Sequence, residues 1–283
     1  MPTEVLQWLQ PEAGQTIVDG TFGGGHHARM LAERVGREGL VIGIDRDPAA
    51  IAAFDLDELP MRLGVANYCD LPEVLATLDQ GPVDSILLDL GLSSDQLDDA
   101  ERGFSFNASG PLDLRFDTTQ GQPAWKLISR ISEGVLADLI YQYGEERFSR
   151  RIARRIVETR RTQPIQSALE LAELVLRAVP NKGKGRNRIH PATRTFQALR
   201  IAVNDELKSL DIALERLVDC LRPGGKLAII SFHSLEDRRV KQAFRDDSRY
   251  SVLTKKPIRP NEAEVAGNPR ARSAKMRVAQ RQS

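Results

Sequence analysis

Short apolar runs alternate with amphipathic stretches in the first third of the chain, and one further run follows much later. Their richness in Val, Ile and Leu predicts buried parallel strands. The runs are Thr16–Gly20, Leu40–Asp45, Arg62–Tyr68, Ser85–Leu90 and Leu227–Phe232. Segments between the first four, such as His27–Val35 and Pro48–Leu56, have a helical period. Alternating strands and helices predict an α/β fold with a doubly wound, Rossmann-like sheet.

The long gap before the last run predicts an inserted domain. One crossover helix needs far fewer residues than those that separate Leu90 from Leu227. Helical patterns occupy much of this gap, at Ala124–Tyr143, Glu145–Arg161, Ser167–Val179 and Phe196–Leu221. We therefore expect a small helical domain at residues 104–204, inserted into a sheet domain formed by residues 1–103 and 205–283. Ser251–Ile258 and Ala274–Gln280 are candidates for two final strands.

The composition is that of a globular protein. No apolar run approaches the ~20 residues of a membrane-spanning helix, and the first residues lack the pattern of a secretion signal. We therefore expect a cytoplasmic protein with no membrane partner. Cys69 and Cys220 lie far apart, and the four histidines lack a zinc-binding spacing. These patterns argue against a disulfide framework and against a metal site.

The net charge of +1 is the sum of opposed blocks. Residues 104–204 hold 17 Lys and Arg against 9 Asp and Glu, and residues 241–283 hold 11 against 4. The remainder holds 12 basic and 26 acidic residues. A basic block can attract a polyanion, but a charge run is usually a solvated surface. Charge alone therefore leaves polyanion binding open.

A glycine-rich segment, Asp19–Ala28, joins the first predicted strand to a helix. Glycine lets the backbone turn sharply and approach a ligand, and the N–H groups of a helix start can face it. Asp45 ends the second strand, where an acid can bind both ribose hydroxyls of an adenosine. A packing turn and a helix cap are the alternatives, although Asp47 before Pro48 is the better cap. Together the two signals indicate an adenosine cofactor.

Later elements separate S-adenosylmethionine from NAD. Asp89 ends the fourth strand, and we expect it to flank the ligand together with Gln96, because ligands lie beyond the carboxyl ends of such strands. The segment Leu221–Lys226 (LRPGGK) resembles the L-x-P-G-G turn of methyltransferases.

Longer blocks make the resemblance specific. They are VDGTFGGGHHAR, GIDRDPAAI, ILLDLGLSSDQLDDAERGFSF, GPLDLRFD, YGEERFSRRIARRIV, HPATRTFQALRIAVNDEL, LRPGGKLAIISFHSLEDRRVK and NPRARS. In this order, and over nearly the whole chain, they resemble the bacterial ribosomal RNA small subunit methyltransferase H family. That family methylates N4 of a cytidine in 16S rRNA.

The resemblance implies a class I methyltransferase sheet with a helical insertion for RNA, and S-adenosylmethionine as cofactor. It also implies cofactor contacts from Gly25, His26, His27, Asp45, Tyr68, Asp89 and Gln96. The chain departs from the family at His26 and Ala28, where Gly and Ser are usual. Tyr68 stands where the family tends to have Phe, and either ring can cover an adenine.

Basic residues of the insertion are the expected RNA contacts, because guanidinium groups bind phosphate bidentately. They are Arg150, Arg151, Arg154, Arg155, Lys182, Lys184, Arg186, Arg188 and Arg194. The first four form i, i+4 pairs on a predicted helix. A surface of ion pairs with Glu145 and Glu146 is the alternative.

Methyl transfer to an exocyclic amine requires alignment, and an acceptor for the N4–H hydrogen helps to localise the lone pair. The chain lacks the Asn/Asp-Pro-Pro-aromatic loop of many amino-methyltransferases. We predict Asp113 as the acceptor, with Asp89 as the alternative. Phe104, Phe106 and Trp125 could stack on a flipped base or form the core of the insertion.

A triad of Ser231, His233 and Asp237 is a further interpretation. We prefer a capping box of Ser234 and Asp237 for the helix that follows. Two other functions stay open. A nicotinamide oxidoreductase would use the same glycine loop and Asp45, and a non-catalytic RNA-binding protein would need only the basic insertion. The expected partner is 16S rRNA within the small subunit, and we also consider a homodimer.

Overall fold

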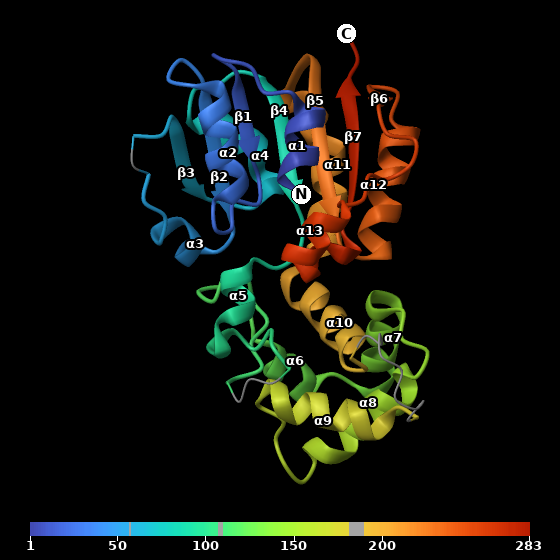
Figure 1. Cartoon of the computed structure of the whole chain (residues 1–283). Coiled ribbons are helices and arrows are strands. Elements are labelled where there is room, and N and C mark those ends of the chain that lie inside the picture. The colour runs from blue at the N-terminus through green and yellow to red at the C-terminus, as the bar shows by residue number, and fades with distance from the viewer. Residues whose placement is uncertain (57, 107–109, 181–189) are drawn as a thin grey trace. The chain divides into compact units, whose positions relative to one another are not determined.

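The chain divides into two compact units, each described here by itself. The computed structural model describes residues 1–56, 58–106, 110–180 and 190–283 (Figure 1). The sheet unit comprises Met1–Gly91 and Leu207–Ser283, and the helical unit comprises Leu92–Glu206. The helical unit thus begins before residue 104, the expected start of the insertion, because Leu92 and Leu97 pack against its core.

The sheet unit is built on a seven-stranded sheet, counted over the described residues, in the order β3-β2-β1-β4-β5-β7-β6 (Figure 1). The strands are β1 (Thr16–Asp19), β2 (Leu40–Asp45), β3 (Met61–Val65), β4 (Val83–Asp89), β5 (Leu221–Ser231), β6 (Tyr250–Val252) and β7 (Lys275–Arg281). β1 to β5 pair in parallel, and β7 is antiparallel to both β5 and β6. The predicted α/β, doubly wound sheet is confirmed. Its strand order reverses between β1 and β4, which is the switch point where such sheets bind ligands.

Successive strand residues supply the two faces of this sheet. Ile17 and Val41 are buried in one apolar cluster, while their neighbours Val18 and Ile42 are buried in another. A strand turns alternate side chains to opposite faces, so a sheet covered on both sides needs continuous apolar runs. This explains why these strands could be found from the sequence.

The helices of the sheet unit cover these two faces, except α13, which buries none of its residues. They are α1 (Pro2–Leu9), α2 (His26–Val35), α3 (Pro48–Ala52), α4 (Leu71–Thr77), α11 (Glu206–Cys220), α12 (Ser234–Asp246) and α13 (Glu262–Gly267). Asp47 caps α3 as expected, because its side chain accepts a hydrogen bond from Ala49 N–H. None of the helices in the described ranges combines the length and apolar composition that a bilayer span requires.

The predicted turn at Leu221–Lys226 lies inside β5. Leu221 pairs with Val83, but Lys226 pairs with Ser85, so the intervening residues bulge out of the ladder. Gly224 has a φ of 81° within this bulge, a conformation that favours glycine. The sequence therefore located the turn correctly but missed the strand residue before it.

The helical unit contains five longer helices and a short one, among the described residues. They are α5 (Ser94–Asp98), α6 (Ala124–Arg130), α7 (Glu133–Gly144), α8 (Ser149–Arg160), α9 (Ala168–Ala178) and α10 (Thr193–Asn204). Two predicted helices are in fact broken. The helix predicted at Ala124–Tyr143 is divided into α6 and α7, and Ser132 caps the start of α7. The helix predicted at Phe196–Leu221 is divided at Asp205, which has a φ of 51° and separates α10 from α11.

Aromatic side chains contribute to the core of the helical unit. Phe104 is buried there, and Phe106 and Trp125 pack against the same cluster. Phe106 also stacks on His190, with ring centroids 4.8 Å apart, and meets the edge of Phe196. Of the two interpretations of these aromatics, the structure supports a packing role.

Candidate functional site

A glycine loop at the end of β1 leads into α2 without room for side chains. Gly25 has a φ of 74° and precedes the first residue of α2. A Cβ on Gly25 would lie 2.8 Å from Phe22 Cζ and still closer to the Phe54 ring. These two rings pack edge to face, with centroids 4.9 Å apart. A residue larger than glycine would therefore be excluded from this position of the loop.

Asp45, the last residue of β2, is hydrogen-bonded to this glycine loop. Its Oδ2 accepts a hydrogen bond from Gly23 N–H at 2.8 Å, and its Oδ1 accepts one from Asp47 N–H at 2.8 Å. Burial raises the pKa of Asp45, although these backbone bonds oppose the rise. Each carboxylate oxygen can accept a second hydrogen bond. The geometry therefore leaves lone pairs for the two ribose hydroxyls that we expect here.

The ends of β1 and β4 bring two further acids and a histidine together. His27 Nε2 lies 3.4 Å from Asp89 Oδ2, and both side chains are largely shielded from solvent. Thr21 joins the strand ends, because Thr21 N–H donates to Asp19 Oδ1 at 3.2 Å and Asp89 N–H donates to Thr21 Oγ1 at 2.6 Å. Asp19 is buried, with 1% of its surface exposed.

Burial and mutual charge shift the pKa values in this cluster. Burial raises the pKa of Asp19 to about 6, and the neighbouring His27 opposes that rise. Burial lowers the pKa of His27, but the hydrogen bond and charge of Asp89 outweigh it, so that the pKa is raised overall. Titratable groups with opposed environments are typical of functional sites.

Sequence reasoning missed Asp19 and Thr21. They lie in the same glycine-rich segment as the predicted residues, and Asp19 is the last residue of β1. The available signal for Asp19 was an acidic residue at the end of a predicted buried strand, next to the glycine loop. The groups that act on Asp19 by charge, however, include Asp89 of β4, which is distant in sequence.

The remaining predicted cofactor residues occupy varied environments. His26 is exposed at the first residue of α2, and Tyr68 is half-buried at the start of the 3-10 helix η1 (Tyr68–Asp70). A Cβ on Gly20 would lie 3.2 Å from Tyr68 Cβ, which places Tyr68 against the glycine loop. Gln96 is buried in the helical unit, where it forms a capping box with Ser93.

Asp113 lies in the helical unit, in an ion pair with its neighbour. Arg115 donates from Nε to Oδ1 and from Nη2 to Oδ2, both at 2.7 Å. Leu114 between them has a φ of 64°, and Asn204 holds this turn through bonds to Leu114 O and Phe116 N. The predicted acceptor is therefore firmly positioned: its Oδ1 accepts two bonds, the second from Arg115 N–H, and its Oδ2 accepts one.

The four predicted arginines of α8 lie on one exposed face. Arg150, Arg151, Arg154 and Arg155 are exposed, whereas Ile152, Ala153, Ile156 and Val157 are buried. Arg154 lies 3.6 Å from Glu133, and Arg194 donates to Glu145 O at 3.2 Å. Lys182, Lys184, Arg186 and Arg188 lie outside the described residues.

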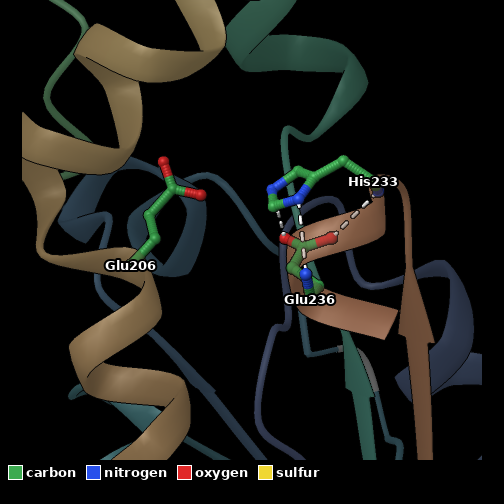
Figure 2. A group of neighbouring side chains, drawn as sticks. All are labelled: Glu206, His233 and Glu236. Atoms are coloured by element: carbon green, nitrogen blue, oxygen red, sulfur yellow. Dashed lines mark hydrogen bonds and ion pairs between the residues drawn. The ribbon is translucent and has the colours of Figure 1, made fainter. Parts of the chain in front are cut away.

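The start of α12 corrects one prediction. His233, not Ser234, is the N-cap: its Nδ1 accepts a hydrogen bond from Glu236 N–H, and Glu236 Oε2 accepts one from His233 N–H (Figure 2). Glu236 Oε2 also accepts a bond from Phe232 N–H. Asp237 instead pairs with Arg277 at 2.7 Å and Lys275 at 3.2 Å. Glu206, also drawn in Figure 2, begins α11 and pairs with Arg200 at 2.8 Å.

Comparisons with known proteins agree over nearly the whole chain. Residues 1–282 match the model of the MraW methylase family. A ribosomal RNA small subunit methyltransferase H from Rhodopirellula baltica is 50% identical over 295 residues, which cover 99% of this chain and 90% of the relative. One from Syntrophotalea carbinolica is 47% identical over 306 residues, 99% and 96% of the two chains. A crystal structure of an rRNA methylase from Streptococcus thermophilus has a TM-score of 0.47 at 11% identity, covering 100% and 98%.

Proposed function

The chain belongs to the MraW methylase family, and from this premise we propose that it methylates N4 of one cytidine in 16S rRNA of the small ribosomal subunit. The methyl donor is S-adenosylmethionine. The single observation that carries the proposal is the cluster of Asp45, His27 and Asp89 beside the glycine loop, at the carboxyl ends of β1, β2 and β4. This is the edge where a doubly wound sheet binds an adenosine.

The residues at this edge fit the cofactor. Among the described side chains, His27 Nδ1 and Asp89 Oδ1 are buried without a hydrogen-bond partner, although buried polar atoms are normally paired. When bound, S-adenosylmethionine supplies an electrophilic methyl group on a sulfonium. A polar ligand at this edge would supply hydrogen-bond partners for these two unpaired atoms.

We assign a separate task to each cofactor residue. Asp45 binds the ribose hydroxyls with its remaining lone pairs, and the Tyr68 ring covers the adenine. The backbone of Gly25, His26 and His27 faces the ligand at the start of α2. Asp89 borders the donor from β4. Gln96 is the remaining residue for which the resemblance implies a cofactor contact.

Methyl transfer also needs an acceptor for the departing N4 proton. We propose Asp113, with Asp89 as the alternative. Arg115 donates two hydrogen bonds to Asp113 Oδ1 and one to Oδ2, so Oδ2 keeps a lone pair for the N4–H hydrogen. A positioned carboxylate polarises the amine as the new N–C bond forms, and it then accepts the proton that N4 releases.

The variants Asp113→Asn and Asp89→Asn distinguish the two candidate acceptors. Single-turnover rates should fall more than 100-fold for the acceptor, while donor affinity falls only for a cofactor residue.

The exposed face of α8 is the proposed RNA contact. Four arginines there can bind phosphates without competition from the apolar side, which is buried. Arg194 and the basic residues 182, 184, 186 and 188 are assigned to the same role. We further propose that the chain works in the cytoplasm and forms a homodimer, and static light scattering at the working concentration tests the dimer.

The decisive experiment uses small-subunit particles that lack the modification. These particles are incubated with the protein and isotopically labelled S-adenosylmethionine, and the labelled nucleotide is then mapped by mass spectrometry. We expect one labelled cytidine carrying the methyl group on N4. Asp45→Asn should abolish labelling at limiting donor, and Glu58→Gln, a change at an exposed carboxylate, should not. Label on another base or atom would refute the proposal.

A further inference from the structure

Asp19 is a buried acid that the proposed methyl transfer does not use. Its Oδ1 accepts a hydrogen bond from Thr21 N–H, but its Oδ2 is buried without a hydrogen-bond partner in the described part of the chain. An unpaired buried carboxylate oxygen is costly, because water can no longer solvate its charge. Such a group is retained most readily where a ligand compensates it.

The groups around Asp19 make the pocket anionic. Asp89 at the end of β4, Asp45 at the end of β2 and His27 on α2 all act on the Asp19 carboxyl by charge. The amino group of Met1 also acts electrostatically on His27. With three carboxyls against one imidazole, ionised Asp19 has too little positive charge near it. A cation bound beside the ends of β1 and β4 would relieve this imbalance.

We propose that Asp19 is a positioning residue that makes this pocket prefer the cationic methyl donor over its neutral-sulfur product. The inference rests on the proposed function. If Asp45 binds the ribose at β2, the rest of the ligand extends across the switch point towards β1 and β4. There the sulfur of S-adenosylmethionine carries a positive charge, whereas the sulfur of S-adenosylhomocysteine carries none. Loss of that charge after methyl transfer weakens the attraction and promotes product release.

The same cluster couples donor binding to pH. Because the pKa of Asp19 is raised to about 6, Asp19 is largely protonated at pH 5 and ionised at pH 7.5. A cation beside Asp19 favours the ionised form, so donor binding at low pH must release a proton. Deprotonation of His27 at higher pH makes the pocket still more negative and acts in the same direction. Donor affinity should therefore rise by up to about tenfold between pH 5 and pH 7.5.

Calorimetric titration tests the proposal. S-adenosylmethionine and S-adenosylhomocysteine are titrated into the full chain at pH 5, 6 and 7.5, in two buffers of different ionisation enthalpy. The variants are Asp19→Asn and the matched control Asp84→Asn. Asp84 lies near the start of β4, at the opposite end of that strand from Asp89. Its carboxylate accepts hydrogen bonds from Thr16 N–H and Arg222.

For the unmodified chain we expect proton release with the donor and a smaller pH effect with the product. Asp19→Asn should remove most of the donor's pH dependence and lower its preference over the product about threefold or more. Asp84→Asn should retain both properties. Equal pH dependence for the two ligands in the unmodified chain would overturn the inference, even if Asp19→Asn failed to fold.

The outcomes also separate this inference from the proposed function. If neither ligand binds, the proposed function fails. If both bind and small-subunit RNA is methylated, but affinity is independent of pH and of Asp19, the charge selection alone is refuted.

Discussion

Replacing Asp19 by Asn should change how stability depends on pH. The folded chain raises the pKa of this carboxyl from 3.8 to about 6, so it holds the proton more tightly than the unfolded chain does. The favourable contribution is complete below about pH 4 and is lost as the pH rises through 6. At 1.36 kcal/mol for each pH unit, ionised Asp19 costs about 3 kcal/mol at pH 7.5. Asparagine does not ionise and avoids this cost.

The assay is urea denaturation of both proteins at pH 4 and at pH 7.5, without ligand. The buried amide has a penalty of its own, about 1–3 kcal/mol, which is the same at both pH values. The informative quantity is therefore the change in the stability difference between the two pH values. It should favour Asp19→Asn at pH 7.5 by up to about 3 kcal/mol. A difference that does not change with pH, or that matches Asp84→Asn, would refute the reasoning.

Three further predictions follow from the geometry. Gly25→Ala should lower the free energy of unfolding by about 2–4 kcal/mol in thermal melts, because of its φ and the Phe54 ring, while Gly14→Ala, with open space around it, should cost about 1–2 kcal/mol. Asn204→Ala should destabilise the chain by about 2–4 kcal/mol in urea melts, since Leu114 and Phe116 lose their partners; an effect under 1 kcal/mol would contradict this. Glutamine at the four arginines of α8 should weaken binding to small-subunit RNA and reduce its salt slope by roughly 3, and an equal loss with Arg37→Gln would contradict specific contact.

Local sequence patterns predicted the parts of the fold that depend on local chemistry. Of the first four strands, β1, β2 and β4 were located to within a few residues because each is buried on both faces. The edge strand β3 is less buried, and its predicted end at Tyr68 lies beyond its observed end at Val65. The cap at Asp47 followed from Pro48. Helix ends were less reliable, since the break at Asp205 depends on a left-handed backbone that no local residue demands. The cap of α12 was misplaced by one residue because His233 serves in place of the usual Ser.

By itself the sequence determined the fold class, the family and the glycine loop with Asp45. These are encoded in contiguous segments whose period and residue types have a direct physical meaning. Only the tertiary structure decided that Asp19, His27 and Asp89 meet, and that Arg115 holds Asp113. The electrostatics of a buried acid depend on which strand ends adjoin it, and strand order is set by packing of the whole sheet. A residue's own neighbours in sequence contain little of that information.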